Sequence, residues 1–442
     1  MNLISPRTRR KTRVLWLSPR HWRRRLVFGG GAVAVGAAAV LFAEGSEYVH
    51  RLFREINGAS AYLPLLLSPL GLALVVWATR RFFPGSQGSG IPQTIAALKM
   101  AEPAERQKVL SLRIAFGKIG LTLLALLSGA SVGREGPTVQ IGASLMHAFG
   151  SWARFSRYEL ERGLILAGGA AGVAAAFNTP LAGVVFAIEE MSRSFEQRTS
   201  GTILTAVVAA GVVSLAVLGN YTYFGHTAAA LSLDRGWLAV LLCGVAGGVL
   251  GGGFSRMLIG AARGLPGLPG RLMRERPVAF AALCGLALAL IGLASGGVTY
   301  GTGYQEARAI LEGSAALPES YGLMKLLATV VSYLSGSPGG IFAPSLAVGA
   351  GFGQNLASLM PYAPAGAVVV LGMVGYFAGV VQAPITAFVI VMEMTDSHEM
   401  ILPLMATAFL GHAVSRLVCH RPLYKALAEG FLARSQETSP SR

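Results

Sequence analysis

The chain has 442 residues, of which 53% are hydrophobic and only 13% charged, and its mean hydropathy is +0.56. Soluble domains average about 25% charged residues, so this composition excludes a soluble protein and indicates a membrane protein. The net charge of +16 does not point to nucleic acid, because many lysines and arginines gather before the first hydrophobic run and no acidic residue precedes Glu44. Such a cluster is typical of a cytoplasmic N-terminus, and we favour this interpretation over an arm that binds nucleic acid.

Runs without Asp, Glu, Lys or Arg follow, each with about the 20 residues that a helix needs to cross a bilayer. They are 26–43, 57–79, 163–188, 200–233, 236–255, 277–305 and 326–392. The last run is long enough for several helices, and the 57 glycines suit helices that pack backbone to backbone. The sequence therefore predicts an all-α polytopic membrane protein, with a basic cytoplasmic segment at 1–25, a transmembrane domain at 26–432 and a short cytoplasmic tail at 433–442.

A glycine-rich loop precedes a short apolar stretch that ends near Met100. Its residues are Gly88, Ser89, Gly90, Ile91 and Pro92. Glycines and a proline ahead of a short helix predict a loop that leads into a helix N-terminus, where backbone amides and a serine hydroxyl can face an anion. Further on, Lys118 stands alone in apolar sequence. Such a lysine is either a functional residue or the partner of a buried carboxylate.

One carboxylate, Glu135, lies between the uncharged segments 119–133 and 136–153. Its immediate neighbours are Gly133, Arg134, Gly136 and Pro137. Glu135 either caps the start of a helix, with Arg134 as its ion-pair partner, or serves a specific function inside the membrane. The segment alone does not decide between these two hypotheses.

Two more acids close the segment that starts at Pro180. Proline at the first helical position predicts a helix start, and the apolar stretch that follows ends in Glu189 and Glu190. Because helix C-termini favour cations, two acids there oppose the helix dipole. They either lie in solvent at the membrane edge or have a function, and the functional hypothesis is favoured for Glu190.

The second half of the chain repeats landmarks of the first half in the same order. The matched pairs are Gly88 with Gly301, Gly133 with Gly340, Gly142 with Gly349, Pro180 with Pro384, and Glu189 with Glu393. The separation falls from 213 to 207 to 204 residues, as small loop deletions would produce. The sequence therefore predicts a duplicated, transporter-like architecture with repeats at about 57–220 and 277–415, in which the paired broken helices mark the binding site.

The second copy of the Glu135 motif lacks the carboxylate. Its residues are Gly340, Ile341, Phe342, Ala343 and Pro344. Phe342 takes the place of Glu135, so this helix start offers only backbone amides, and we expect an anion near Ile341 and Phe342. Glu135 would reach the same place as a rival. Competition between a carboxylate and an anion makes anion binding depend on protonation.

Together, these motifs resemble the CLC family of chloride channels and chloride/proton antiporters, from the first span to about Leu432. Tyr424, in the run Arg421-Pro422-Leu423-Tyr424, completes the resemblance. It implies a fold of two inverted-topology repeats of tilted and broken helices, and a homodimer with a separate pore in each subunit. It also implies a multi-pass protein of the bacterial type in the cell (inner) membrane, with both termini cytoplasmic and no room after Tyr424 for the regulatory domains that some relatives append.

The resemblance also implies a chloride site. Ser89 and Tyr424 would donate their hydroxyls to a central chloride, and the backbone amides of Ile341 and Phe342 would complete its shell, with Gly136 among the chloride-binding residues. Serine rather than proline at position 89 favours chloride over nitrate, and the intact first motif argues against the fluoride branch of the family.

Two glutamates would handle protons if the resemblance holds. Glu135 would be the external gate, which blocks the outer anion site when ionised and swings aside when protonated. Glu190 would pass protons toward the cytoplasm, and because channels commonly have an apolar residue there, it favours exchange. The supporting residues would be Arg134, Lys118, Gly88, Gly90, Pro92, Gly133, Pro137, Gly340 and Pro344.

One departure from the family pattern concerns the inner proton route. Gln93 stands where similar bacterial members often have glutamate, and Ile95 offers no acid nearby. Lys118 therefore lacks one acidic partner that the resemblance implies.

The leading hypothesis is a chloride/proton antiporter, and the alternative is a passive, pH-gated chloride channel on the same fold. An enzyme is disfavoured because the seven histidines show no catalytic or metal-binding spacing, and His147 and His412 stand alone in apolar sequence. The three cysteines, Cys243, Cys284 and Cys419, predict neither disulfides nor a metal. No cofactor is expected beyond the transported chloride and protons.

Overall fold

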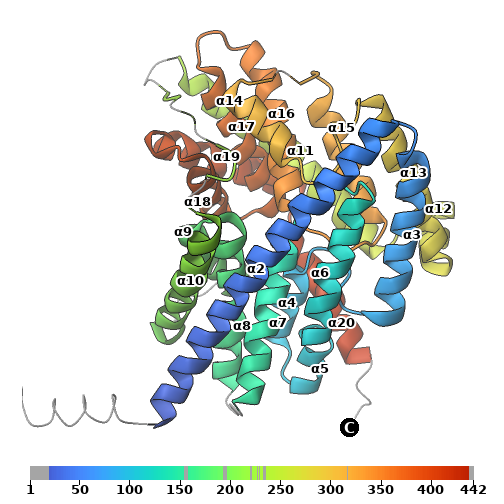
Figure 1. Ribbon diagram of the computed structural model, residues 1–442. Coiled ribbons are helices and arrows are strands. Elements are labelled where there is room, and N and C mark those ends of the chain that lie inside the picture. The colour runs from blue at the N-terminus through green and yellow to red at the C-terminus, as the bar shows by residue number, and fades with distance from the viewer. Residues whose placement is uncertain are drawn as a thin grey trace, which may run out of the picture.

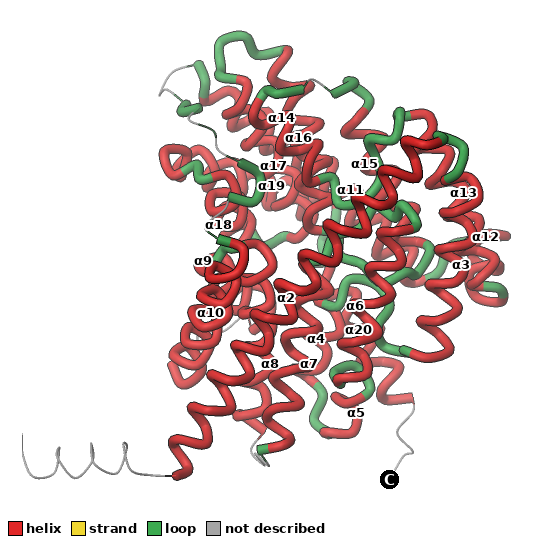
Figure 2. The backbone as a smooth tube through the Cα atoms, viewed as in Figure 1, coloured by secondary structure: helices red, strands yellow, loops and turns green. Residues whose placement is uncertain are grey.

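The computed structural model describes residues 19–153, 158–192, 197–219, 222–225, 227, 229–231, 235–315 and 317–437. Most of the predicted basic segment at 1–25 and the end of the predicted tail lie outside these residues. Within them the chain forms helices joined by loops, with two isolated β-bridges and no strand (Figure 2). The helices of the first half are α2 (Pro19–Ala59), α3 (Pro64–Phe82), α4 (Ile91–Lys99), α5 (Pro103–Gln107), α6 (Leu112–Leu127), α7 (Glu135–Trp152), α8 (Tyr158–Phe177), α9 (Pro180–Phe186), the π-helix η1 (Ala187–Ser192) and α10 (Gln197–Leu218).

The second half begins with α11 and ends with α20. Its helices are α11 (Trp237–Arg263), α12 (Gly267–Glu275), α13 (Pro277–Ala294), α14 (Tyr304–Glu312), α15 (Tyr321–Leu334), α16 (Phe342–Ser358), α17 (Ala365–Val381), α18 (Pro384–Thr395), the 3-10 helix η2 (His398–Met400), α19 (Ile401–Val418) and α20 (Leu423–Glu437). Among the described residues, seven helices are long and apolar enough to cross a membrane. The prediction of a multi-pass membrane protein is therefore confirmed.

The helix boundaries differ from the predicted runs in two places. The run 200–233 was expected to be one span, but α10 ends at Leu218, because Gly219 adopts a φ of +77° and turns the chain out of the helix. The run 326–392 divides into parts of α15 to α18, as its length predicted. Helix α20 continues to Glu437, beyond the predicted end of the transmembrane domain at 432.

The order of helices in the first half recurs in the second half. The corresponding pairs are α3 and α13, α4 and α14, α6 and α15, α7 and α16, α8 and α17, α9 and α18, and α10 and α19. Helices α4 and α7 lie in the lower half of the view, whereas α14 and α16 lie in the upper half (Figure 1). The starts of α7 and α16 meet through the bridge between Gly133 and Gly340, so the two helices run away from one another in opposite senses. The predicted inverted repeat is thereby confirmed.

Glycines let equivalent helices approach closely in both halves. A Cβ on Gly142 of α7 would lie 2.2 Å from the carbonyl oxygen of Gly168 on α8. In the second half, a Cβ on Gly349 of α16 would lie 2.7 Å from the Cα of Met373 on α17. Because real Cβ contacts are not this short, both crossings require glycine, as the abundance of this residue suggested. These crossings hold the helices whose first residues form the site.

Candidate functional site

Three loops meet where the short helices begin. The amide of Gly133 donates to the carbonyl of Gly340, and the amide of Gly340 donates back, both at 2.7 Å. The Gly88 amide donates to the carbonyl of Ser337 at 3.2 Å, and the Gly339 amide donates to the carbonyl of Gly88 at 3.0 Å. These bonds bring the N-termini of α4, α7 and α16 together. Free amides and the positive ends of the helix dipoles therefore converge on one buried place.

The glycines of these loops make room for side chains of the site. A Cβ on Gly136 would lie 2.3 Å from the Oγ of Ser89, and one on Gly133 would lie 2.2 Å from Oε2 of Glu135. Gly90, the residue before α4, has a φ of +100°, which disfavours any residue with a side chain. Gly88, with a φ of +63°, also lies in the left-handed region, so all four glycines of the first two motifs have a steric reason.

Two hydroxyls lie at this meeting point. Ser89 is 3% exposed and Tyr424, from the start of α20, is fully buried, and the two side chains are close enough to interact. Neither hydroxyl has a hydrogen-bond partner of ordinary geometry among the described residues. Because buried hydroxyls are normally bonded, this pair has the chemistry to donate to an anion. The ring of Phe342, the first residue of α16, packs 5.8 Å from that of Tyr424.

Glu135 is the first residue of α7 and is fully buried. Its Oε1 accepts a hydrogen bond of 3.1 Å from the hydroxyl of Tyr223. Arg134 donates from Nη1 to the carbonyl of Ala43 on α2 at 2.9 Å, and its guanidinium lies 5.5 Å from the centre of the Tyr223 ring. Tyr223 follows α10 in a stretch that was predicted to be part of a span, and it was not among the predicted site residues.

Lys118 fixes the loop that carries Ser89. Its buried ammonium donates to the carbonyls of Ser86 at 2.7 Å and Gly88 at 2.6 Å. Gln93 does not substitute for an acidic partner of the lysine, because its Nε2 donates to the carbonyl of Gln87 at 2.5 Å. Backbone carbonyls therefore surround the ammonium where the resemblance implied a carboxylate.

The second repeat contains an equivalent lysine that the sequence analysis overlooked. Lys325 is also fully buried and donates to the carbonyls of Thr299 at 2.9 Å and Gly301 at 2.7 Å, in the loop before α14. Glu306 occupies the position that corresponds to Gln93 and interacts electrostatically with Lys325. The offsets of the repeat, 207 and 213 residues, would have located both residues.

The two acids after α9 have different environments. Glu189 accepts from the amides of Ile385 at 3.1 Å and Thr386 at 2.6 Å, at the start of α18. Its repeat counterpart Glu393 accepts from the first amides of α9 in the same way. Each carboxylate thus caps the N-terminus of the other repeat's helix, which explains why acids end these helices. Glu190 is only 4% exposed, so it does not lie in solvent at the membrane edge, and it belongs to the π-helix η1.

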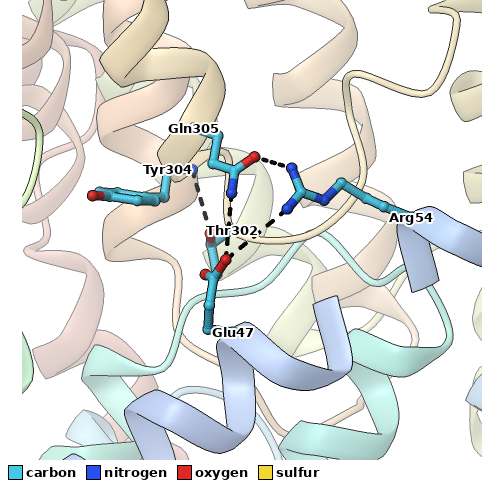
Figure 3. Close-up of polar contacts among 5 residues, drawn as sticks. All are labelled: Glu47, Arg54, Thr302, Tyr304 and Gln305. Atoms are coloured by element: carbon cyan, nitrogen blue, oxygen red, sulfur yellow. Dashed lines mark hydrogen bonds and ion pairs between the residues drawn. The ribbon is translucent and has the colours of Figure 1, made fainter. Parts of the chain in front are cut away.

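Two cavities are lined by residues of this region. The first cavity, of about 270 Å³, is lined by Arg134 and Tyr223 and by residues of α2 and α14. Beside it lies a polar cluster that joins these two helices (Figure 3), in which Arg54 donates to the amide oxygen of Gln305 and lies 4.0 Å from Glu47. The second cavity, of about 200 Å³, is lined by Ser89 and by residues of α11, α15 and α20. Ser89 lines this second cavity, whereas Arg134, the residue before Glu135, lines the first.

Broken helices of an inverted repeat, whose N-termini meet at buried hydroxyls and a buried carboxylate, define a membrane protein that transports ions. The chain belongs to the voltage gated chloride channel family, whose model matches residues 71–416. The family resemblance drawn from the motifs is therefore confirmed.

Solved structures of this family share the fold. A slow cyanobacterial Cl⁻/H⁺ antiporter is 26% identical with a TM-score of 0.82, and the match covers 94% of this chain and 99% of that chain. A CLC-type fluoride/proton antiporter is 24% identical with a TM-score of 0.76, covering 90% and 97%. A eukaryotic CLC transporter is 22% identical with a TM-score of 0.73, covering 92% and 75%.

Proposed function

We propose that the chain exchanges chloride for protons across the membrane. The observation that carries the proposal is the buried carboxylate of Glu135 at the first position of α7. It belongs to the same meeting point of helix N-termini as the hydroxyls of Ser89 and Tyr424, which can donate to an anion. The similarity to a Cl⁻/H⁺ antiporter over 94% of the chain supports the exchange of an anion for protons.

Chloride binds between the hydroxyls of Ser89 and Tyr424 and the amides of Ile341 and Phe342. Helix N-termini stabilise it without a full counter-charge, so it binds and leaves readily. Gly136 contributes because it has no side chain, which leaves room for the Ser89 hydroxyl close to its backbone. Lys118 contributes by holding the carbonyls of the preceding loop, which orients the serine.

Glu135 couples this anion to a proton. The ionised carboxylate competes with chloride for the same positive helix ends, whereas the protonated side chain is neutral and gives way. Chloride can therefore displace the Glu135 side chain from this place only when the carboxylate has bound a proton. Glu190, which is buried in a π-helical turn, passes that proton on toward the cytoplasm.

The orientation and assembly complete the proposal. The basic residues at the start of α2 favour a cytoplasmic N-terminus in the cell (inner) membrane. Helix α20 ends on the same side of the molecule as the start of α2 (Figure 1), so the C-terminal end of the chain is assigned to the cytoplasm as well. A homodimer forms through α9, α10, α18 and α19, which lie at one side of the molecule (Figure 1) and expose large apolar side chains. These include Leu181, Leu204, Val208, Val212, Ile385, Leu402 and Phe409.

Flux through purified protein in liposomes tests the function. A chloride gradient should drive protons uphill, and Glu135→Gln should abolish this pumping while chloride still moves, because glutamine mimics the protonated gate. Chloride flux without proton movement in the native chain would instead establish the passive channel, whose reversal potential follows chloride alone. If chloride movement were still coupled to protons in Glu135→Gln, Glu135 would not be the gate and proton carrier.

A further inference from the structure

We propose that Tyr223 is a positioning residue that holds Glu135 in its closed, ionised state and so sets the pH at which the gate opens. The proposal rests on the function proposed for Glu135 and adds a residue, Tyr223, to which that function assigns no role. Its basis is the hydrogen bond of 3.1 Å from the Tyr223 hydroxyl to Oε1 of Glu135.

The surroundings of Tyr223 fix its ring. It is 3% exposed and packs edge to face against Phe177 at 5.6 Å and Tyr304 at 4.8 Å between ring centres. The amide of the next residue, Phe224, donates to the carbonyl of Met394 at 2.9 Å, which ties the segment to the end of α18. Because these contacts fix the ring, they also hold its hydroxyl in place beside the Glu135 carboxylate.

The hydrogen bond acts on one charge state of the gate. A phenol that donates to a carboxylate favours the ionised form, and hydrogen bonds to charged groups are stronger than those between neutral groups. Glu135 must break this bond before it leaves the anion site. Because Tyr223 and Arg134 both line the first cavity, the proton that releases the gate arrives on the side where the tyrosine lies.

Other titratable and charged groups near this pair come from several elements and remain in place when only the hydroxyl is removed. They are Arg134 just before α7, Glu44, Glu47 and His50 of α2, Tyr304, Arg308 and Glu312 of α14, and Tyr424 of α20. A change confined to one hydroxyl therefore isolates its effect on Glu135.

Tyr223→Phe removes the hydroxyl and keeps the ring. We expect the pH at which chloride flux is half-maximal, titrated on the side of the first cavity, to rise by about one unit, because the carboxylate accepts its proton more readily. At a pH above the native midpoint, chloride flux should rise up to about ten-fold. An unchanged midpoint would overturn the proposal.

Tyr304→Phe is the matched control. Tyr304 lines the same cavity and packs on Tyr223, but its hydroxyl accepts a hydrogen bond from Arg308 at 3.3 Å and is not bonded to Glu135. Removal of the Tyr304 hydroxyl should therefore leave the midpoint unchanged. In a Glu135→Gln background, Tyr223→Phe should no longer alter the pH profile, and an equal shift there would assign the effect to another group. The pH of half-maximal chloride flux can be measured whether or not the protein pumps protons. A protein that does not exchange chloride for protons would therefore give a different result from one in which Tyr223 does not act on Glu135.

Discussion

Gly136 shows how far the site depends on one missing side chain. A Cβ at this position would lie 2.3 Å from the Oγ of Ser89 and 2.9 Å from its carbonyl oxygen, so Ser89 must move if Gly136 becomes alanine. Because a displacement of about 1 Å in a binding group can cost orders of magnitude in rate, we expect Gly136→Ala to lower chloride flux in liposomes at least about ten-fold. The matched control is Gly120→Ala in α6, where a Cβ meets nothing within 4 Å. Equal flux in both variants would contradict this account.

The residues that sequence reasoning located are those with a local pattern around them. Ser89 and Glu135 stand among glycines and prolines at the start of short apolar helices, and this pattern is visible without any knowledge of the fold. Tyr223 is 88 residues from Glu135 and has no pattern of its own, so only the tertiary contact reveals it. Glu306 and Lys325 are an intermediate case, because the repeat places them although their own neighbours do not.

At the scale of elements, α9 and α18 stabilise one another's first turns through long-range caps. Oε2 of Glu393 accepts from the amide of Ala182 at 2.7 Å, and Oε1 accepts from that of Leu181 at 3.1 Å. A capping carboxylate at a helix N-terminus contributes about 1–2 kcal/mol through its hydrogen bonds and the helix dipole.

We therefore expect Glu393→Gln to make the first turn of α9 open more often. Amide hydrogen exchange at Leu181 and Ala182 should speed up by about 5- to 30-fold, which corresponds to that loss of free energy. Glu399→Gln, an exposed acid in η2, serves as the control and should leave exchange in α9 unchanged. Slow exchange in Glu393→Gln would show that packing alone holds this turn.

Helix starts were easier to predict than helix ends. Proline precedes or opens α3, α9, α13 and α18, and it fixes the backbone there whatever the tertiary contacts are. The end of α10 at Leu218 depends on a single glycine in an apolar run, which composition alone does not distinguish from the glycines inside helices.

At the scale of the whole molecule, the proposed exchange requires a site that is reached from both faces of the membrane. Residues 43–50 of α2 line the first cavity, and α2 begins at Pro19, so these residues lie about 35–45 Å along the helix from its start at 1.5 Å per residue. A helix with its N-terminus at the cytoplasmic face therefore carries this cavity to the opposite face. The second cavity, at Ser89, lies near the ends of α11 and α15.

Labelling with a membrane-impermeant thiol reagent tests this two-sided arrangement. The native cysteines, Cys243, Cys284 and Cys419, are all buried, so the unmodified chain should react little and serves as the control. Thr302→Cys in the first cavity should react in intact cells, and Ala262→Cys in the second cavity should react only in inverted vesicles. Because each reagent molecule reaches one face, reaction of both variants from the same face would contradict a site placed between two opposite cavities. Reversed labelling, with Ala262→Cys reactive in cells, would instead keep the two-sided site and overturn the cytoplasmic N-terminus inferred from the basic residues of α2.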